Sequence, residues 1–135
     1  MVRKIAKASL SALESPDAEL SISLVSDKKI TELNQQYRNR PHPTDVLSFS
    51  LREGAFSDIN PHLLGDVVIS VETAKRQAGA ERISFEEEIC VLLIHGILHL
   101  LGYDHEKSNV EAQAMQKKEQ TLLLLMKRKA FLSAR

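Results

Sequence analysis

The sequence predicts an α+β fold (mixed α/β), in which a small, mostly parallel or mixed sheet of about four strands is covered by about five helices. Three observations predict this class. Apolar residues recur with helical spacing in several segments, and they alternate with period two in others. The segments follow one another as helix, strand, helix, two strands and then mostly helix, an order that builds one small sheet covered by helices.

The first half of the chain supplies two helices and two strands in this prediction. Leu20, Ile22 and Leu24 alternate with serines, which is the pattern of a half-buried strand. The elements expected here are a helix over 2–14 ended by Ser15-Pro16-Asp17, a strand over 20–24, a helix capped by Ser26 or Asp27 that carries Ile30, Leu33 and Tyr37 on one face, a loop over 38–44 and a strand over 46–51.

Two capping boxes mark helix starts in the second half, at Ser84-Phe85-Glu86-Glu87 and Ser108-Asn109-Val110-Glu111. The helix that follows Ser84 is apolar almost all round, so it is expected to be buried and to hold any ligands it carries rigidly. The other expected elements are a polar loop over 53–62, a strand over 63–70, a helix over 71–80 that ends near Gly79, and a last helix from 108 to about Leu132.

Composition limits the class of protein. The 135 residues amount to about one domain, so a single domain over residues 1–135 is expected. The apolar stretch from Ile89 to Tyr103 is too short to span a membrane, and the basic N-terminus is not followed by an apolar signal core. The single cysteine, Cys90, permits no internal disulfide. These features predict a soluble, cytoplasmic protein, and the net charge of zero counts against a large nucleic-acid footprint.

Three of the five histidines, His95, His99 and His105, lie within eleven residues. Residues i and i+4 share one face of a helix, so His95 and His99 can reach a single point. Gly102 suits a tight or left-handed break that can return His105 to that point. Three neutral imidazoles with one open position commonly hold catalytic zinc. The alternative is a set of packed core histidines. Cys90 lies about 140° around the helix from His95 and is expected in the core, not as a fourth ligand.

The histidine spacing matches the metzincin protease motif H-E-x-x-H-x-x-G-x-x-H in every position but one. In those proteases the glutamate that follows the first histidine is the general base. Gly96 occupies this position here and cannot transfer a proton. The metal-binding pattern is therefore present without the protease's base, which argues against a peptidase.

A second polar segment, from Tyr37 to Phe49, leads into an apolar strand. Arg38 offers a planar fork of donors that suits a phosphate or carboxylate, although from the residues alone a surface arginine is the stronger reading. By the same reasoning Thr44-Asp45 caps the strand, and Leu64-Gly65-Asp66 is a turn into a strand. Asp104 either orients a ligand histidine or shapes its own turn.

Taken together, these blocks resemble the YbeY family of bacterial rRNA maturation factors, which are single-strand-specific metallo-endoribonucleases. The resemblance rests on Leu33 through Phe49, on Leu64-Gly65-Asp66, and on His95-Gly96 through His105, and it covers most of residues 30–110. Gly96 and Tyr103-Asp104 are features of that family that metzincin proteases lack. The chain departs from the family at Ser50, where a proline is common.

The resemblance implies a zincin-like site on the central buried helix, with one Zn²⁺ per chain on His95, His99 and His105, and a functional Arg38 near the metal. It implies single-stranded RNA as substrate, specifically the 3′ end of 16S rRNA of the small ribosomal subunit, and a role in ribosome quality control. Ribosomal proteins or assembly factors are further expected partners, whereas a membrane and DNA are not.

The hypothesis for the chemistry is hydrolysis of an RNA phosphodiester by Arg38, His95, His99 and His105. Zinc lowers the pKa of a coordinated water to about 7, so no strong protein base is needed. Arg38 would neutralise charge on the phosphate, and Asp104 or a second metal-bound water is the candidate general acid. Attack by water and attack by the 2′-hydroxyl both remain open. The alternatives are a non-catalytic ribosome assembly factor with structural zinc, and a zincin-like hydrolase of small substrates or peptides.

Overall fold

The structure, a computed structural model, describes residues 1–51 and 62–131, and its centre is a small mixed sheet. Strands β1 (Glu19–Val25), β2 (Val46–Ser50) and β3 (Leu63–Ser70) lie in the order β1-β3-β2. β1 runs parallel to β3, whereas β2 runs antiparallel to it, so that Ser48 lies opposite Val67. β2 is therefore at an edge of this sheet.

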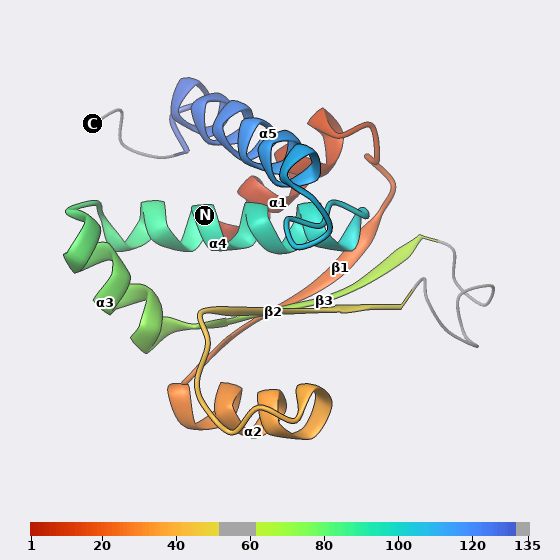
Figure 1. Ribbon diagram of the computed structural model, residues 1–135. Helices are drawn as coiled ribbons and strands as arrows, with labels where there is room; N and C mark the ends of the chain where they lie inside the picture. Colours follow the sequence, from red (N-terminus) through yellow and green to blue (C-terminus); the bar gives the residue numbers. More distant parts are fainter. Residues whose placement is uncertain (52–61, 132–135) are drawn as a thin grey trace.

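The helices pack on both faces of the sheet (Figure 1). They are α1 (Val2–Ala12), α2 (Asp27–Arg38), α3 (Val71–Glu81), α4 (Phe85–Leu100) and α5 (Asn109–Arg128). In Figure 1, α2 covers one face and α4 the other, while α1 and α5 pack on the outer side of α4 and α3 follows directly from β3. This arrangement places α4 between the sheet and two helices, and so accounts for its apolar composition.

The predicted α+β class is confirmed, with differences in detail. The described residues form three strands and five helices, so the expected fourth strand is not confirmed. The predicted polar loop over 53–62 falls mostly on residues 52–61, which lie outside the described residues.

The turn predicted at Leu64-Gly65-Asp66 is wrong, because all three residues lie inside β3. Gly65 pairs with Ser50, and Asp66 pairs with Phe49. Gly65 has a φ of +149°, and a Cβ at this position would collide with the carbonyl oxygen of Phe49. The glycine therefore permits a close approach of two strands, which its sequence context does not distinguish from a turn.

The last helix also ends earlier than predicted, at Arg128 and not near Leu132. Ala130 takes a left-handed conformation with a φ of 60°, and the Phe131 amide donates to the carbonyl of Met126. This turn allows Phe131 to pack against the main hydrophobic core. No glycine or proline marks this helix end, so the sequence carried no stop signal there.

The predicted helix starts are confirmed by their caps. The hydroxyls of Ser26, Ser84 and Ser108 accept the backbone N–H groups of Lys29, Glu87 and Glu111 at 3.2, 3.0 and 3.1 Å. Each of these bonds satisfies an amide that has no partner within the helix. The hydrogen bond from Glu87 to Ser84 thus fixes where α4 begins, and α4 carries two of the candidate histidines.

Contacts of the Asp27 carboxylate join α2 to α3. The carboxylate of Asp27 accepts the hydroxyls of Ser70 and Thr73, both at 2.6 Å, and pairs with Arg76 at 2.9 Å. These hydrogen bonds, led by the one from Ser70, lower the pKa of Asp27 to about 2. The two helices on either side of the sheet's end are therefore held together by an ionised group.

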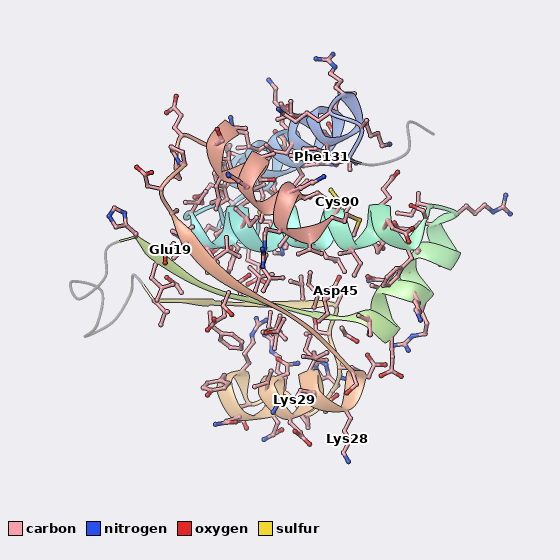
Figure 2. The ribbon with its side chains drawn as sticks, turned by 180° about the vertical axis from the view of Figure 1, so that it is seen from behind. Glu19, Lys28, Lys29, Asp45, Cys90 and Phe131 are labelled. Atoms are coloured by element: carbon pink, nitrogen blue, oxygen red, sulfur yellow. The ribbon has the colours of Figure 1, made fainter. Side chains whose placement is uncertain are left out.

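The main core lies between the sheet and the helices α1, α4 and α5, and α4 supplies much of it, including Leu93, Ile94, Ile97 and Leu98. Cys90 is fully buried in this core, on the side of α4 that faces α1 and α5 (Figure 2), as the sequence predicts. Burial raises the pKa of its thiol to about 12, which keeps it in the protonated form. Among the described residues, no helix is long and apolar enough to cross a membrane.

Candidate active site

A cleft of about 790 Å³ runs around the edge strand β2. One side is built from the C-terminal end of α2 and the loop that follows it, and the other from α4 and the turn that follows it. The side chains lining it are Tyr37, Arg38, Arg40, Thr44, Asp45, Val46, Ser48, Phe49, Ser50, His95, His99, Asp104, His105 and Glu106. The four predicted site residues, Arg38, His95, His99 and His105, therefore share one cleft.

His95 and His99 project from one face of α4, as their spacing predicts. Nδ1 of His95 lies 3.0 Å from Oε1 of Glu119, and Nδ1 of His99 lies 3.1 Å from the carbonyl oxygen of Tyr103. A carbonyl and an ionised carboxylate can only accept, so Nδ1 carries the proton in both rings. Nε2 of each imidazole is then left with its lone pair available to a metal.

His105 reaches the cleft through the predicted break after α4. Gly102 has a φ of +103°, and the amide of Tyr103 donates to the carbonyl of Leu98 at 3.0 Å. This left-handed turn brings the ring of His105 to a centroid distance of 5.3 Å from the ring of His95. Nε2 of His105 lies 3.9 Å from a carboxylate oxygen of Glu106.

These histidines fit a zinc site by their donor chemistry, although they are not arranged as a finished cage. Among the residues that the structure describes, no group of three or more His, Cys, Asp or Glu side chains is set to hold a metal ion. Three imidazoles, two of them with Nδ1 already engaged by an oxygen acceptor, are nevertheless a donor set that zinc takes in proteins.

Glu119 is the partner of His95 that sequence reasoning missed. It lies on α5, 24 residues from His95, and the sequence gives no sign that the two meet. The hydrogen bond with Glu119 raises the pKa of His95, an effect opposed by burial of the ring. Glu119 therefore has the position of a carboxylate that orients a ligand histidine, the role that the sequence left open for Asp104.

Asp104 instead shapes its own turn. Its Oδ1 accepts the backbone amide of Glu106 at 2.9 Å, and the side chain lines the cleft. Of the two roles left open by the sequence, the structure supports the local one.

Gly96 lies where α4 packs closely against the sheet. A Cβ at this position would lie 2.7 Å from Cγ1 of Val67 and 3.2 Å from the hydroxyl oxygen of Ser48, and that hydroxyl donates to the Gly96 carbonyl at 3.2 Å. A side chain at position 96 would therefore point into the sheet. A glutamate there could not act as the protease base without moving α4 away from β3.

Arg38 is the last residue of α2, and the loop that follows it is fastened to the same helix by Asn34. The buried Asn34 donates through its side-chain Nδ2 to the backbone carbonyl of His42 at 2.9 Å. The backbone carbonyl of Asn34 accepts the backbone amide of Arg40 at 3.2 Å. Asn34 and Arg40 were not singled out from the sequence. These contacts fix the backbone of the loop, and the side chains of Arg38 and Arg40 line the cleft beside it.

Asp45 closes the loop, as predicted for a residue that caps the strand. Its Oδ1 accepts the amide of Val46 at 2.8 Å, and its Oδ2 accepts Nε2 of Gln77 on α3 at 3.2 Å. Figure 2 shows Asp45 near the α3 end of the sheet.

A second, smaller cavity of about 210 Å³ is lined by Asp45, His95 and Glu88. Burial, followed by the charges of Glu81, Asp45 and Glu87, raises the pKa of Glu88 to about 7.

Comparison with known proteins assigns the chain to a family. The sequence matches the family model described as "Endoribonuclease YbeY" over residues 1–127. Curated proteins of that name from Geobacter metallireducens and Syntrophus aciditrophicus are 45% and 48% identical to it, over 94% and 93% of this chain and 85% and 79% of their own. A Thermotoga maritima protein solved in solution superposes with a TM-score of 0.68 at 29% identity, over 95% of this chain and 80% of its own. The chain therefore belongs to the Endoribonuclease YbeY family.

Proposed function

We propose that this chain is a zinc-dependent, single-strand-specific endoribonuclease that acts in 16S rRNA 3′-end maturation and in ribosome quality control. Its relatives carry the name endoribonuclease, which supports an RNA-cleaving hydrolase. The single observation that carries the proposal is the cleft in which Arg38 meets His95, His99 and His105. One cleft then contains both the proposed metal ligands and the proposed cation for the phosphate.

His95, His99 and His105 would hold one Zn²⁺ per chain, which when bound supplies a Lewis acid for the scissile phosphate. Glu119 and the Tyr103 carbonyl keep His95 and His99 in the tautomer that leaves Nε2 unprotonated. The imidazoles of His95 and His99 are therefore oriented before any metal arrives, which lowers the reorganisation that binding requires.

Arg38 would stabilise the negative charge that builds on the phosphate oxygens during cleavage. Its guanidinium is always protonated and can present two parallel N–H donors to a phosphate. The Asn34 contacts fix the backbone of the loop that follows Arg38, and the Arg38 side chain lines the same cleft as the histidines. A charge that is already in place when the transition state forms accelerates reaction more than one that must first be brought there.

The substrate proposed is single-stranded RNA, specifically rRNA of the small ribosomal subunit, in the cytoplasm. Ribosomal proteins or assembly factors are proposed as further partners, and neither DNA nor a membrane is included. The free thiol of Cys90 agrees with a reducing compartment.

Cleavage of defined RNAs by the purified protein tests this function. The substrates are a fragment that spans the 3′ end of 16S rRNA, an unrelated single strand, a duplex and a peptide panel, each incubated with zinc or with chelator. We expect cleavage of the single-stranded substrates only, its loss with chelator, and its loss in His99→Ala, which also controls for contaminating nuclease. Cleavage of peptides but not RNA would favour a zincin-like hydrolase, and zinc binding without any cleavage would favour an assembly factor.

A further inference from the structure

Tyr37 is an exposed aromatic residue in the candidate active-site cleft. Its side chain is 61% exposed. The other large hydrophobic side chains that are exposed in the described part of the chain are aliphatic. It lies one residue before Arg38 at the end of α2, and both side chains line the cleft. Exposure of much of an aromatic side chain costs hydrophobic stabilisation, so a ring left in this position calls for an explanation.

The ring of Tyr37 is held in place without being buried. It lies edge-on to the ring of Phe49 on β2, with centroids 5.1 Å apart and planes inclined by 60°. Leu33 and Ile30, one and two turns earlier on the same face of α2, belong to the small core between α2 and the sheet, where Phe49 also packs. Tyr37 continues this apolar face past the edge of the core and into the cleft. The contact with Phe49 thus fixes the ring, so that little side-chain entropy is lost when a ligand covers it.

Two arginines line the same cleft as this ring. Arg38 and Arg40 line the cleft next to Tyr37, and Asn34 fastens the loop between them. A fixed aromatic ring beside guanidinium groups is the combination that binds single-stranded nucleic acid, because the ring stacks with a base while the cations contact the backbone phosphates. A duplex buries its bases in its own stack and offers no free face to such a ring.

We propose that Tyr37, supported by Phe49, forms a stacking site for one nucleobase of single-stranded RNA next to the scissile phosphate. This inference rests on the proposed endoribonuclease function and deepens it, because it supplies a physical basis for single-strand preference. Every base has a π face, so the site is tolerant of base identity. Tyr37 contacts the substrate without taking part in the proton or phosphate chemistry.

Binding of metal-free protein to RNA isolates this contact from cleavage. Fluorescence anisotropy is measured with a labelled single strand of about 10 nucleotides and the variants Tyr37→Ala, Tyr37→Leu and Tyr37→Phe. We expect the dissociation constant to rise about 5- to 100-fold in Tyr37→Ala and nearly as much in Tyr37→Leu, and to stay within about twofold in Tyr37→Phe. Leu124→Ala on α5, at a side chain that is 50% exposed and outside the cleft, is the matched control and should bind like the wild type.

An abasic scan of the same oligonucleotide locates the stacked base. Removal of one base should weaken binding by the wild type, and removal of that same base should have no further effect in Tyr37→Ala. Equal abasic effects in both proteins, wild-type affinity in Tyr37→Ala, or full rescue by Tyr37→Leu would overturn the stacking site.

The outcomes separate this inference from the function beneath it. If the zinc-loaded wild type cleaves single-stranded RNA but the Tyr37 variants bind and cleave like the wild type, only the stacking site fails. If the wild type neither binds nor cleaves RNA, the proposed function and the stacking site fail together. Unchanged unfolding midpoints in the variants show that any loss of binding is not a loss of folding.

Discussion

Oε1 of Glu119 lies 3.0 Å from Nδ1 of His95 and so joins α5 to the face of α4 that carries the candidate metal ligands. The pair is only partly exposed, with 31% of the His95 side chain and 26% of the Glu119 side chain accessible. A carboxylate in this position fixes both the tautomer and the orientation of the imidazole. The last helix, which contributes no residue to the lining of the cleft, thereby acts on the site.

Replacement of Glu119 by alanine is expected to weaken zinc binding about 10- to 100-fold, because His95 loses the acceptor that orients it. Glu119→Gln keeps an oxygen acceptor and should lie between the alanine variant and the wild type. The measurement is competition for zinc with a chromophoric chelator. Glu111→Gln, which removes the same charge from the first turn of α5, is the control and should bind zinc like the wild type. Wild-type zinc affinity in Glu119→Ala would show that the contact is incidental.

Gly96→Ala is expected to destabilise the fold by about 1–3 kcal/mol, because the new methyl group would meet Val67 at the α4–sheet contact. Urea denaturation measures the change in the free energy of unfolding. Gly96→Glu should be worse, and it should gain no peptidase activity, because its side chain would point into the sheet.

Gly79→Ala on α3 is the matched control for this prediction. A Cβ at position 79 would meet no heavy atom within 4 Å, so alanine should stabilise the helix by about 0.5–1 kcal/mol through its higher helix propensity. Equal effects of the two substitutions would mean that position 96 is not a close contact. In the double variant Gly96→Ala, Val67→Ala, part of the loss at position 96 should be recovered.

Arg38→Ala should slow RNA cleavage about 100-fold and leave zinc bound, since the residue acts on the phosphate and not on the metal. Arg38→Lys keeps the charge but loses the planar fork, so an intermediate rate is expected. Single-turnover cleavage together with elemental analysis separates the two effects. Arg3→Ala on α1, outside the cleft, should cleave at the wild-type rate. If Arg38→Ala also cleaves at that rate, Arg38 is a surface residue.

The buried carboxyl of Glu88 makes stability depend on pH. Its pKa is raised from 4.5 to about 7, so between these values the unfolded chain has lost a proton that the folded protein keeps. The free energy of unfolding should therefore fall as the pH rises from about 4.5 to 7, and this contribution should level off above pH 7.

Glu88→Gln removes this ionisation and keeps the shape of the side chain. The variant should be about 1–3 kcal/mol more stable than the wild type at pH 8, and the difference should disappear toward pH 4. Urea denaturation at several pH values measures it. A difference that is the same at pH 4 and pH 8 would exclude titration of Glu88 as its cause.

Much of the fold follows from local sequence signals. Ser26, Ser84 and Ser108 cap the helices they were predicted to cap, and the alternation at Leu20, Ile22 and Leu24 falls within a strand. Gly102 makes the predicted break that brings His105 back toward His95. In each case the signal and the structure it specifies lie within one or two helical turns.

The features that were missed depend on residues far apart in the chain. Glu119 contacts His95 only because α5 packs on α4. Gly65 was predicted to form a turn, because its pairing with β2 cannot be inferred from the local sequence. From the sequence, Gly96 indicates only that the protease's general base is absent. Its second role, which is to leave space for the side chains of Val67 and Ser48, depends on the register of the sheet. Spacing rules carry no information on such contacts, since they are set by tertiary packing.

Titration of the metal-free protein with zinc, with the rate of single-stranded RNA cleavage followed at each addition, tests the central claim most directly. We predict a rate near zero without metal, a linear rise, and saturation at one zinc per chain, with neither stoichiometric zinc nor activity in His99→Ala. Cleavage by the metal-free protein, or a His99→Ala variant that keeps one zinc per chain and cleaves RNA, would contradict the assignment of the three histidines as the zinc site of an endoribonuclease.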